Sequence, residues 1–246
     1  MAEGNYRVER AIIMAAGTGT RMHPVTLHTP KPLVKVNGVR MIETIIQSLH
    51  SNGIFEIYVV TGYLKEQFRF LELEYKDLVL IENPYYSCCN NICSLSVARD
   101  HLQNCIILDG DQIIYNPDIL SPVFSRSGYN AVWCDEETSE WLMQVKNGIV
   151  VSCSRTGGSH GWQLYSVSRW NKSDGSRLKK HLEIEFEEKK NRQIYWDDIA
   201  LFCYPEEYQL GIFQMDKKDI IEIDNLNELI AIDPEYSDYR EVEYEH

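Results

Sequence analysis

Residues 15–36 read AAGTGTRMHPVTLHTPKPLVKV, and this stretch decides the fold that we predict. It follows a short apolar run that indicates a strand. Gly17 and Gly19 permit a turn that exposes backbone N–H groups to a polyphosphate, because glycine adopts positive φ without a steric cost. Arg21 adds a forked cation, and Lys31, held between two prolines, adds a point-like one. The stretch therefore indicates a site for a nucleoside triphosphate.

This pattern differs from two common phosphate-binding motifs. It lacks the GxxxxGK[ST] spacing of a P-loop and the third glycine of the dinucleotide fingerprint. Its order of residues instead resembles the AAGxGTRxxPxTxxxPKPLxxV signature of the sugar-nucleotidyltransferase superfamily, whose members join a nucleoside triphosphate to a phosphorylated small molecule. An ordinary strand–turn–helix connection with incidental basic residues is the alternative, and the many positions that match in order disfavour it.

The composition bounds the class of protein. The chain has 246 residues, enough for one large α/β domain or for a domain with a small lid. Its formal net charge of −13 disfavours a nucleic acid or an anionic membrane as partner, since both reward a basic surface. No apolar run reaches the ~18 residues of a membrane span, and no signal peptide opens the chain. Seven cysteines, mostly within apolar segments, suit reduced thiols, so we expect a cytoplasmic protein. The oligomeric state stays open.

Strand and helix signals alternate through the first half of the chain. Strands are predicted at Ala11–Met14, Glu56–Thr61, Leu78–Ile81 and Cys105–Leu108, and helices at Met41–Leu49, Leu64–Tyr75 and Ile92–Leu102. Strands separated by helices of this length predict an α/β fold, a Rossmann-like mixed, mostly parallel sheet with helices on both faces. Ligands of such sheets bind at the carboxyl ends of the strands, where the glycine-rich loop and Asp111 both fall.

The second half of the chain changes character. Asn147-Gly148 predicts a β-hairpin within Trp141–Cys153, and Trp162–Trp170 alternates as a further strand. Helices are predicted at Leu178–Lys190 and at Asn225–Ile232, the second capped by Asn225. We therefore predict a single nucleotidyltransferase domain over 1–246. Its core spans about 8–135 and 193–233, a small β-rich acceptor-binding insertion or lid spans about 136–192, and an acidic tail spans 234–246.

Two carboxylates stand where a divalent cation is needed. Transfer of a nucleotidyl group to a phosphate requires no general base, because the attacking oxygen is already ionised near neutral pH. Catalysis then consists of bringing two polyanions together and stabilising charge, a task for carboxylate-bound Mg²⁺. Asp111 follows a strand in a Gly-Asp pair like the superfamily's metal-binding aspartate, and Asp197 follows a stretch predicted as a strand. We predict that Asp111 and Asp197 hold the metal, with Asp109 behind them and Asp198 facing the other way.

Further motifs narrow the resemblance to one family. They are Val60–Phe68 (VTGYLKEQF), Asn90-Asn91 with Ser94-Leu95, Asp109-Gly110-Asp111, Ser139-Glu140-Trp141 and Tyr195-Trp196-Asp197. In this order, over nearly the whole chain, they are similar to the bacterial CTP:phosphocholine cytidylyltransferases and their 2-aminoethylphosphonate cytidylyltransferase relatives. The resemblance implies a Mg²⁺-dependent enzyme that forms a CDP-alcohol from CTP and releases pyrophosphate.

The resemblance also implies roles for particular residues. Arg21 and Lys31 are the expected catalytic residues, Arg21 on the β- and γ-phosphates and Lys31 between the α-phosphate and the acceptor phosphate. The expected nucleotide contacts are Ala15, Ala16, Gly17, Thr18, Gly19, Thr20, Arg21, Asn90, Ser94 and Gly110. The expected acceptor contacts are Glu140, Trp141, Tyr165, Tyr195 and Trp196.

The acceptor's headgroup has two interpretations. A trimethylammonium group donates no hydrogen bonds and is best held by aromatic rings, which Trp141, Tyr195 and Trp196 offer, so phosphocholine is the predicted acceptor. The polar stretch 156–161 departs from the phosphocholine pattern and suits a primary amine, so 2-aminoethylphosphonate or phosphoethanolamine is the alternative. A sugar-1-phosphate nucleotidyltransferase and a non-catalytic nucleotide-binding module are further alternatives.

Overall fold

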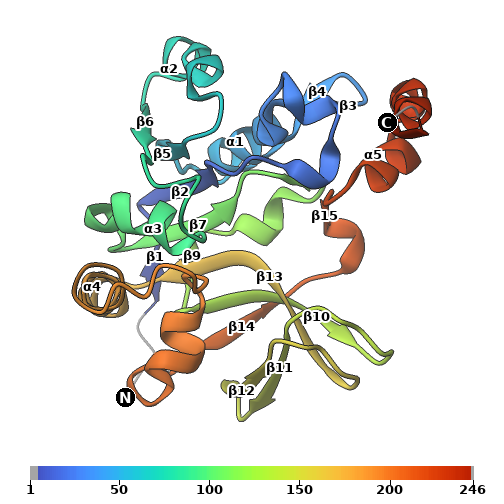
Figure 1. Ribbon diagram of the computed structural model, residues 1–246. Helices are drawn as coiled ribbons and strands as arrows, with labels where there is room; N and C mark the ends of the chain where they lie inside the picture. The colour runs from blue at the N-terminus through green and yellow to red at the C-terminus, as the bar shows by residue number, and fades with distance from the viewer. Residues whose placement is uncertain (1–4, 245–246) are drawn as a thin grey trace.

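A nine-stranded mixed sheet runs through the computed structural model, which describes residues 5–244 (Figure 1). Its strands are β2 (Arg10–Ala15), β5 (Glu56–Thr61), β6 (Leu78–Glu82), β7 (Cys105–Asp109), β10 (Gly128–Cys134), β11 (Leu142–Lys146), β12 (Ile149–Ser154), β13 (Gly161–Trp170) and β14 (Gly211–Gln214). The run β7-β2-β5-β6 is parallel throughout. Strand β13 joins β7 in the antiparallel sense and connects it to β10 and β11. The predicted α/β fold with a mixed sheet is confirmed.

Short ladders and helices complete the fold. The two-stranded ladders join β1 (Tyr6–Arg7) to β9 (Val123–Phe124), β3 (Lys35–Val36) to β4 (Val39–Arg40), and β8 (Gln112–Ile114) to β15 (Ile220–Glu222). The α-helices are α1 (Met41–Ser51), α2 (Phe70–Glu74), α3 (Ile92–Val97), α4 (Lys172–Leu182) and α5 (Leu226–Ile232). Single 3₁₀ turns or short 3₁₀ helices lie at Thr20–Met22, Val25–Leu27, Lys31–Leu33, Lys65–Phe68, Arg99–His101, Pro117–Leu120, Pro205–Glu207, Lys217–Asp219 and Pro234–Tyr244, and π-helical segments at Glu183–Glu188 and Ile199–Cys203.

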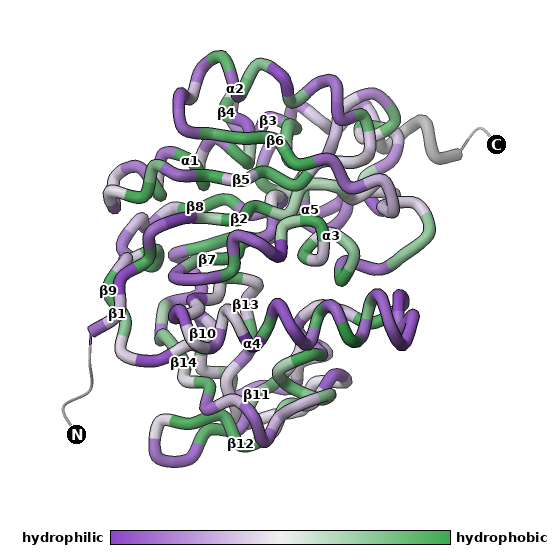
Figure 2. The backbone as a smooth tube through the Cα atoms, turned by 90° about the vertical axis from the view of Figure 1, so that its left-hand side faces the viewer, coloured by the Kyte–Doolittle hydropathy of each residue, from purple (hydrophilic) through white to green (hydrophobic). Residues whose placement is uncertain are grey.

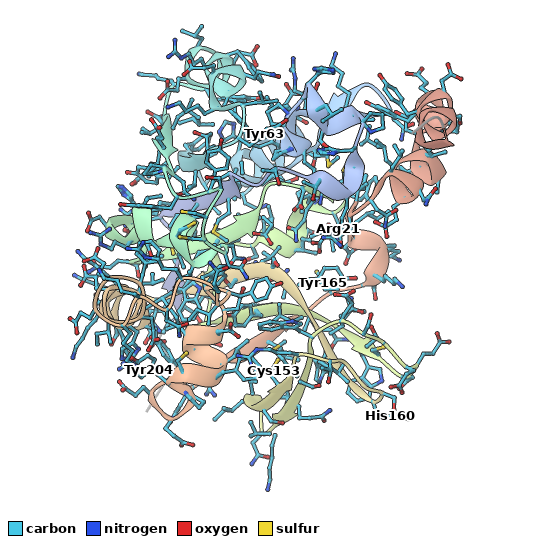
Figure 3. The ribbon with its side chains drawn as sticks, in the orientation of Figure 1. Arg21, Tyr63, Cys153, His160, Tyr165 and Tyr204 are labelled. Carbon is cyan, nitrogen blue, oxygen red and sulfur yellow. The ribbon has the colours of Figure 1, made fainter. Side chains whose placement is uncertain are left out.

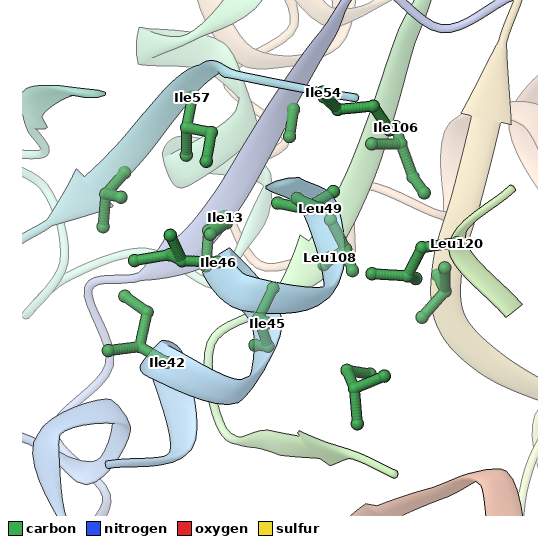
Figure 4. Packing of buried hydrophobic residues seen from close by; sticks show 14 of the residues in the cluster. Ile13, Ile42, Ile45, Ile46, Leu49, Ile54, Ile57, Ile106, Leu108 and Leu120 are labelled. Atoms are coloured by element: carbon green, nitrogen blue, oxygen red, sulfur yellow. The ribbon is translucent and has the colours of Figure 1, made fainter. Parts of the chain in front are cut away.

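Helices cover the sheet on both faces, with their apolar side chains packed against it. Successive strand residues point to opposite faces, so Ile13 packs with α1 whereas Ile12 packs with the cluster under α3 and α4. Figure 4 shows the first face, where Ile45 and Leu49 of α1 lie against the strands. In Figure 2, hydrophilic and hydrophobic residues alternate along α4, as expected for a helix with one solvated side. Helices on both faces were predicted, and this arrangement is confirmed.

Three helices differ in their bounds from the sequence pattern. Leu64, at φ 48°, is left-handed, so the predicted helix Leu64–Tyr75 is split into a 3₁₀ turn and α2. The predicted helix Ile92–Leu102 ends at Val97 and continues only as a 3₁₀ turn. Helix α4 begins earlier than predicted because the side chain of Asn171 caps it by accepting from the Asp174 N–H. Apolar spacing carries no information on such local hydrogen bonds.

The turn signals were more accurate. Asn147 and Gly148 both have positive φ, 53° and 74°, and join β11 to β12 as the predicted hairpin. Asn225 caps α5 by accepting from the Glu228 N–H. The segment before Asp197 was predicted as a strand, and this was wrong: the Asp198 N–H donates to the Tyr195 carbonyl in a turn that leads into a π-helical segment.

The topology brings distant segments to one edge of the sheet. The glycine-rich loop leaves the carboxyl end of β2 and Gly110 follows the neighbouring β7, so both lie at the same edge. Strand β15 pairs with β8 and carries Glu222 to this edge from the far end of the chain. The predicted insertion at about 136–192 contains β11, β12, β13 and α4, and its boundaries stay a prediction. No helix among residues 5–244 is long and apolar enough to cross a membrane.

Candidate active site

The glycine-rich loop forms one wall of a cavity of about 340 Å³. Gly19 has φ 64°, and a Cβ there would lie 3.1 Å from both Lys31 Cβ and Thr26 Cγ2, so the backbone at this position requires glycine. Gly17, by contrast, faces open space. The cavity is lined by Met14, Ala15, Ala16, Gly17, Thr18, Gly19, Thr20, Arg21, Lys31, Pro32, Asn91, Ser94, Asp109, Asp111 and Asp224. The loop residues predicted to contact a nucleotide therefore lie together.

Side chains that follow β5 hold the outer part of this loop in place. The Tyr63 hydroxyl donates to the carbonyl of Thr26 at 3.0 Å, and Gln67 Nε2 donates to that of His28 at 2.8 Å. Thr26 in turn donates its hydroxyl to the Gly19 carbonyl at 2.7 Å. Through these hydrogen bonds, Tyr63 and Gln67 of the VTGYLKEQF motif fix the loop between Gly19 and Lys31.

The two predicted catalytic cations are held by acidic partners. Lys31 is 7% exposed, and its Nζ lies 2.5 Å from Asp111 Oδ2 and 3.3 Å from Asp224 Oδ1. Arg21 is exposed, and its Nη2 lies 2.8 Å from the same Asp224 oxygen. Burial alone lowers the pKa of Lys31, but the adjacent Asp111 outweighs it and raises that pKa above its ordinary value. Lys31 is therefore charged at neutral pH.

Three carboxylates among the described residues are close enough to share a metal ion. One oxygen each of Asp111, Glu222 and Asp224 lies within 4.8 Å of the others. Asp111 Oδ1 is buried and has no hydrogen-bond partner among residues 5–244. The donors are all hard oxygens, the kind that Mg²⁺ prefers. Chemistry and the orphaned oxygen both fit a divalent cation at this group.

Sequence reasoning missed Glu222 and Asp224. Asp224 lines the cavity, and both residues approach Asp111 through the β8–β15 ladder, a pairing between segments more than 100 residues apart. The signal was present in Ile220-Ile221-Glu222-Ile223-Asp224, where carboxylates two residues apart follow a strand-like apolar run. Two such residues share one side of an extended backbone.

The excess of negative charge raises the pKa values of acidic side chains in and beside this group. Burial and the neighbouring Asp111 raise the pKa of Asp109 to about 7. Burial, with Asp111 and Asp109 close by, also raises the pKa of Glu222 well above its ordinary value. An added cation relieves this repulsion, which is a second reason why the group suits a metal.

Asp197, the second predicted metal ligand, lies outside the three-carboxylate group. It is 6% exposed, and burial together with nearby Asp109 raises its pKa well above the ordinary value. Its Oδ1 has no hydrogen-bond partner among the described residues. Asp198 does face elsewhere, toward Arg155, but through the turn and not through strand alternation. The metal role of Asp197 stays a prediction.

The predicted nucleotide contacts beyond the loop divide into two sets. Ser94 lines the cavity, and Gly110 packs so closely beneath it that a Cβ would lie 3.1 Å from the Met14 carbonyl. Asn90 does not line the cavity, because its amide donates to the Gln193 carbonyl at 3.1 Å. Its neighbour Asn91 lines it instead, while accepting from the Trp196 N–H.

The predicted acceptor contacts also separate. Glu140 and Tyr165 line a second cavity of about 210 Å³ that shares Asp224 with the first. In Figure 3, Tyr165 on β13 lies between Arg21 and Cys153 of β12. Trp141 and Tyr195 meet edge to face, with ring centroids 5.6 Å apart, and line neither of these two cavities.

Trp196 is placed differently from the prediction. It is 1% exposed and packs with Tyr129 and Trp170, with ring centroids 6.1 Å from each. The buried ring exposes no face to a ligand in this structure, and the acceptor role of Trp196 stays a prediction.

Comparison with known proteins places this site in a family. The sequence model of the MobA-like NTP transferase domain matches residues 11–167. The chain is 38% identical to the 2-aminoethylphosphonate cytidylyltransferase of Lancefieldella rimae over 94% of its own length and 95% of that protein. It is 34% identical to the choline-phosphate cytidylyltransferase of Haemophilus influenzae, over 89% and 93% respectively.

A solved structure agrees in fold. The CTP:phosphocholine cytidylyltransferase of Streptococcus pneumoniae superposes with a TM-score of 0.82 at 30% identity, covering 96% of this chain and 98% of that one. The glycine-rich loop, the buried lysine and the acidic group thus occur in a chain that matches these enzymes nearly from end to end. This chain belongs to the MobA-like NTP transferases and, among them, to the cytidylyltransferases.

Proposed function

We propose that the protein transfers CMP from CTP to the phosphate or phosphonate of a small amino-alcohol derivative and releases pyrophosphate. The observation that carries this proposal is Lys31, a buried cation set between the glycine-rich loop and three carboxylates. Such a cation suits a reaction in which two anionic groups must approach each other, because it offsets their repulsion at the point of contact.

The nucleotide would lie along the loop after β2. A Cβ at Gly17 would meet no atom within 4 Å, so phosphate oxygens can approach the backbone there and accept from its N–H groups. Arg21, which is exposed and contacts Asp224 through Nη2, can turn from Asp224 to the β- and γ-phosphates. Asn91 and Ser94 supply polar groups on the opposite wall for the base. Lys31 would then contact the α-phosphate and the acceptor.

We propose Mg²⁺ as the cofactor, held by Asp111 and Asp224 with Glu222 beside them. When bound, Mg²⁺ neutralises phosphate charge as a Lewis acid. The Asp111 oxygen that has no partner among the described residues supports this assignment. Lys31 and Arg21 form ion pairs with these acids in the structure, and in the complex their side chains would contact phosphate oxygens instead.

We propose that the acceptor enters from the side of β11 to β13, so that 136–192 acts as the acceptor-binding part of one domain. Glu140 and Tyr165 line the cavity that Asp224 also lines. The carboxylates of Glu140 and Asp224 suit a positively charged headgroup. Phosphocholine and 2-aminoethylphosphonate both have such a headgroup.

We place the reaction in the cytoplasm, supported by seven cysteines that are all free thiols in the structure.

A pyrophosphate-release panel tests the proposal. CTP, UTP, dTTP and ATP are each offered with phosphocholine, phosphoethanolamine, 2-aminoethylphosphonate and glucose 1-phosphate. We expect release that depends on both CTP and an amino-alcohol acceptor, and a CDP-linked product by mass spectrometry. A best rate with glucose 1-phosphate, or no release with any pair while CTP still binds, would refute it.

A further inference from the structure

Three aromatic side chains, Trp141, Tyr195 and Phe202, form a cluster that we call the aromatic box; the cavity lined by Glu140 and Tyr165 is called the acceptor cavity. The Trp141 ring meets Tyr195 at 5.6 Å and Phe202 at 5.5 Å, each nearly perpendicular. Trp141 directly follows Glu140, which lines the acceptor cavity. The faces of such rings attract a cation.

The aromatic box already holds a cation from its own chain. The Arg155 guanidinium carbon lies 3.6 Å from the centre of the Phe202 ring and 5.8 Å from that of Trp141. Its Nε and Nη2 donate to Asp198 Oδ1 at 2.8 and 2.6 Å. The Asp198 side chain is only 4% exposed, so this ion pair is shielded from water on the carboxylate side.

The backbone that presents Arg155 is constrained. The next residues form a turn in which Gly157 has φ 74° and a Cβ would lie 1.8 Å from the Thr138 carbonyl oxygen. Thr138 and Gly158 also exchange two backbone hydrogen bonds of 2.9 Å. The turn is thus fixed against the segment that leads from Thr138 to Trp141, which constrains the direction from which Arg155 reaches the box.

We propose that Arg155 is a specificity-determining residue that excludes quaternary ammonium headgroups. This inference rests on the proposed function. A trimethylammonium group needs the same aromatic faces as the guanidinium, so it can enter the box only if Arg155 leaves both the rings and Asp198. That displacement would leave a buried carboxylate unpaired, which is costly.

A primary ammonium does not need the aromatic box. Its three N–H donors require oxygen acceptors, and the adjacent cavity offers Glu140, the Tyr165 hydroxyl and Glu222. Arg155 can keep its place while such a headgroup binds. The chain should therefore use aminoethyl acceptors better than choline acceptors, with Arg155 as the reason.

The test compares the two acceptors in variants of the full chain. Arg155→Met keeps apolar length without charge, and Arg155→Met/Asp198→Asn also removes the unpaired charge. Arg177→Met is the matched control, since Arg177 likewise pairs with an aspartate at 2.6 Å and lies 5.6 Å from an aromatic ring, that of Tyr208. kcat/KM is measured for phosphocholine and for 2-aminoethylphosphonate at saturating CTP.

We expect the ratio of kcat/KM for phosphocholine to that for 2-aminoethylphosphonate to rise roughly tenfold in both Arg155 variants. It should stay at the wild-type value in Arg177→Met. An unchanged ratio in an active double variant would overturn the inference, as would a wild-type enzyme that already prefers phosphocholine. Should Arg155→Met fail to fold, Arg155→Lys serves instead: it keeps the ion pair, frees the Phe202 face and should raise the ratio by a smaller factor.

A binding measurement separates this inference from the proposed function. Choline alone is titrated while tryptophan fluorescence is followed, because Trp141 would report entry into the aromatic box. We expect a saturable change in Arg155→Met and none in the wild type over the same concentrations. No CTP-dependent turnover with any acceptor would contradict the proposed function, whereas equal choline responses in both proteins would contradict only the role of Arg155.

Discussion

Lys31 is a buried cation, with almost no surface in contact with water. A buried ammonium is stable only with compensating charge, and Asp111 and Asp224 provide it at 2.5 and 3.3 Å. These partners hold Lys31 in the wall of the cavity, within reach of a ligand's phosphates. The position is fixed before the substrates arrive, which is the condition for stabilising charge at the moment of reaction.

Replacement of Lys31 should therefore reduce turnover and not merely binding. For Lys31→Ala we expect kcat and kcat/KM to fall together, by roughly 10²–10³. The exposed Lys35, four residues on, gives the control: Lys35→Ala should keep wild-type kinetics. Steady-state rates of pyrophosphate release are the measurement. A higher KM for CTP with kcat intact would instead make Lys31 a uniform binding residue.

The carboxylates can be assigned by their effect on metal dependence. Asp111→Asn and Asp224→Asn each remove a charge from the three-carboxylate group, so we expect turnover to fall by orders of magnitude and the Mg²⁺ concentration for half-maximal activity to rise. Asp197→Asn should leave that Mg²⁺ concentration unchanged, because Asp197 lies outside the group. A rise in Asp197→Asn, with none in Asp224→Asn, would restore the assignment predicted from the sequence.

At the scale of the element, the glycine-rich loop is fixed by backbone conformation at one residue and left open at another. Gly19 has positive φ and touches Lys31 and Thr26, whereas Gly17 has neither constraint. Glycine is therefore needed at position 19 for the backbone conformation, and at position 17 it leaves space for a ligand. Substitution by alanine separates the two purposes.

Gly19→Ala should lower stability by ~1–2 kcal/mol through left-handed strain, with lower activity as a consequence. Gly17→Ala should change stability by less than ~0.5 kcal/mol. It should nevertheless raise the KM for CTP, because the added methyl group occupies space where phosphates would approach the backbone. Urea unfolding and initial rates measure the two effects, and equal destabilisation by both substitutions would contradict this distinction.

The sequence predicted correctly those elements that are determined by neighbouring residues in the chain. The β2 strand with its loop, α1, the Asn147-Gly148 hairpin and the Asn225 cap each depend on residues within a few positions. The approach of Glu222 and Asp224 to Asp111 depends instead on pairing between β8 and β15, which no local pattern states. The same holds for Trp196, whose burial results from packing against Tyr129 and Trp170.

At the scale of the whole molecule, stability should depend on pH through buried histidine. His181 is 3% exposed, stacks on Tyr204 at 3.8 Å and shares a 2.8 Å hydrogen bond with the Tyr208 hydroxyl. Burial lowers its pKa below the ordinary 6.5. The unfolded chain therefore binds a proton more readily, and the stability from neutral His181 is present above pH 6.5 and lost as pH falls below it.

His181→Gln should reveal this contribution as a difference. Other acids and histidines titrate equally in both proteins, so we compare the loss of unfolding free energy between pH 7.5 and pH 5.5 in wild type and variant. We expect the wild type to lose more. An equal loss in both would show that His181 is as easily protonated in the folded protein as in the unfolded chain.

Strand β13 has a consequence for how such enzymes diverge. Its last residues, Val167–Trp170, pair with β7 beside the phosphate site, whereas Gly161–Leu164 pair with β10 and lead from the turn that presents Arg155. Substitution of Arg155, which precedes this constrained turn, leaves the register next to Asp109 unchanged. Selection can thus act on headgroup preference through this one side chain, while the ancestral chemistry of nucleotide activation is inherited intact.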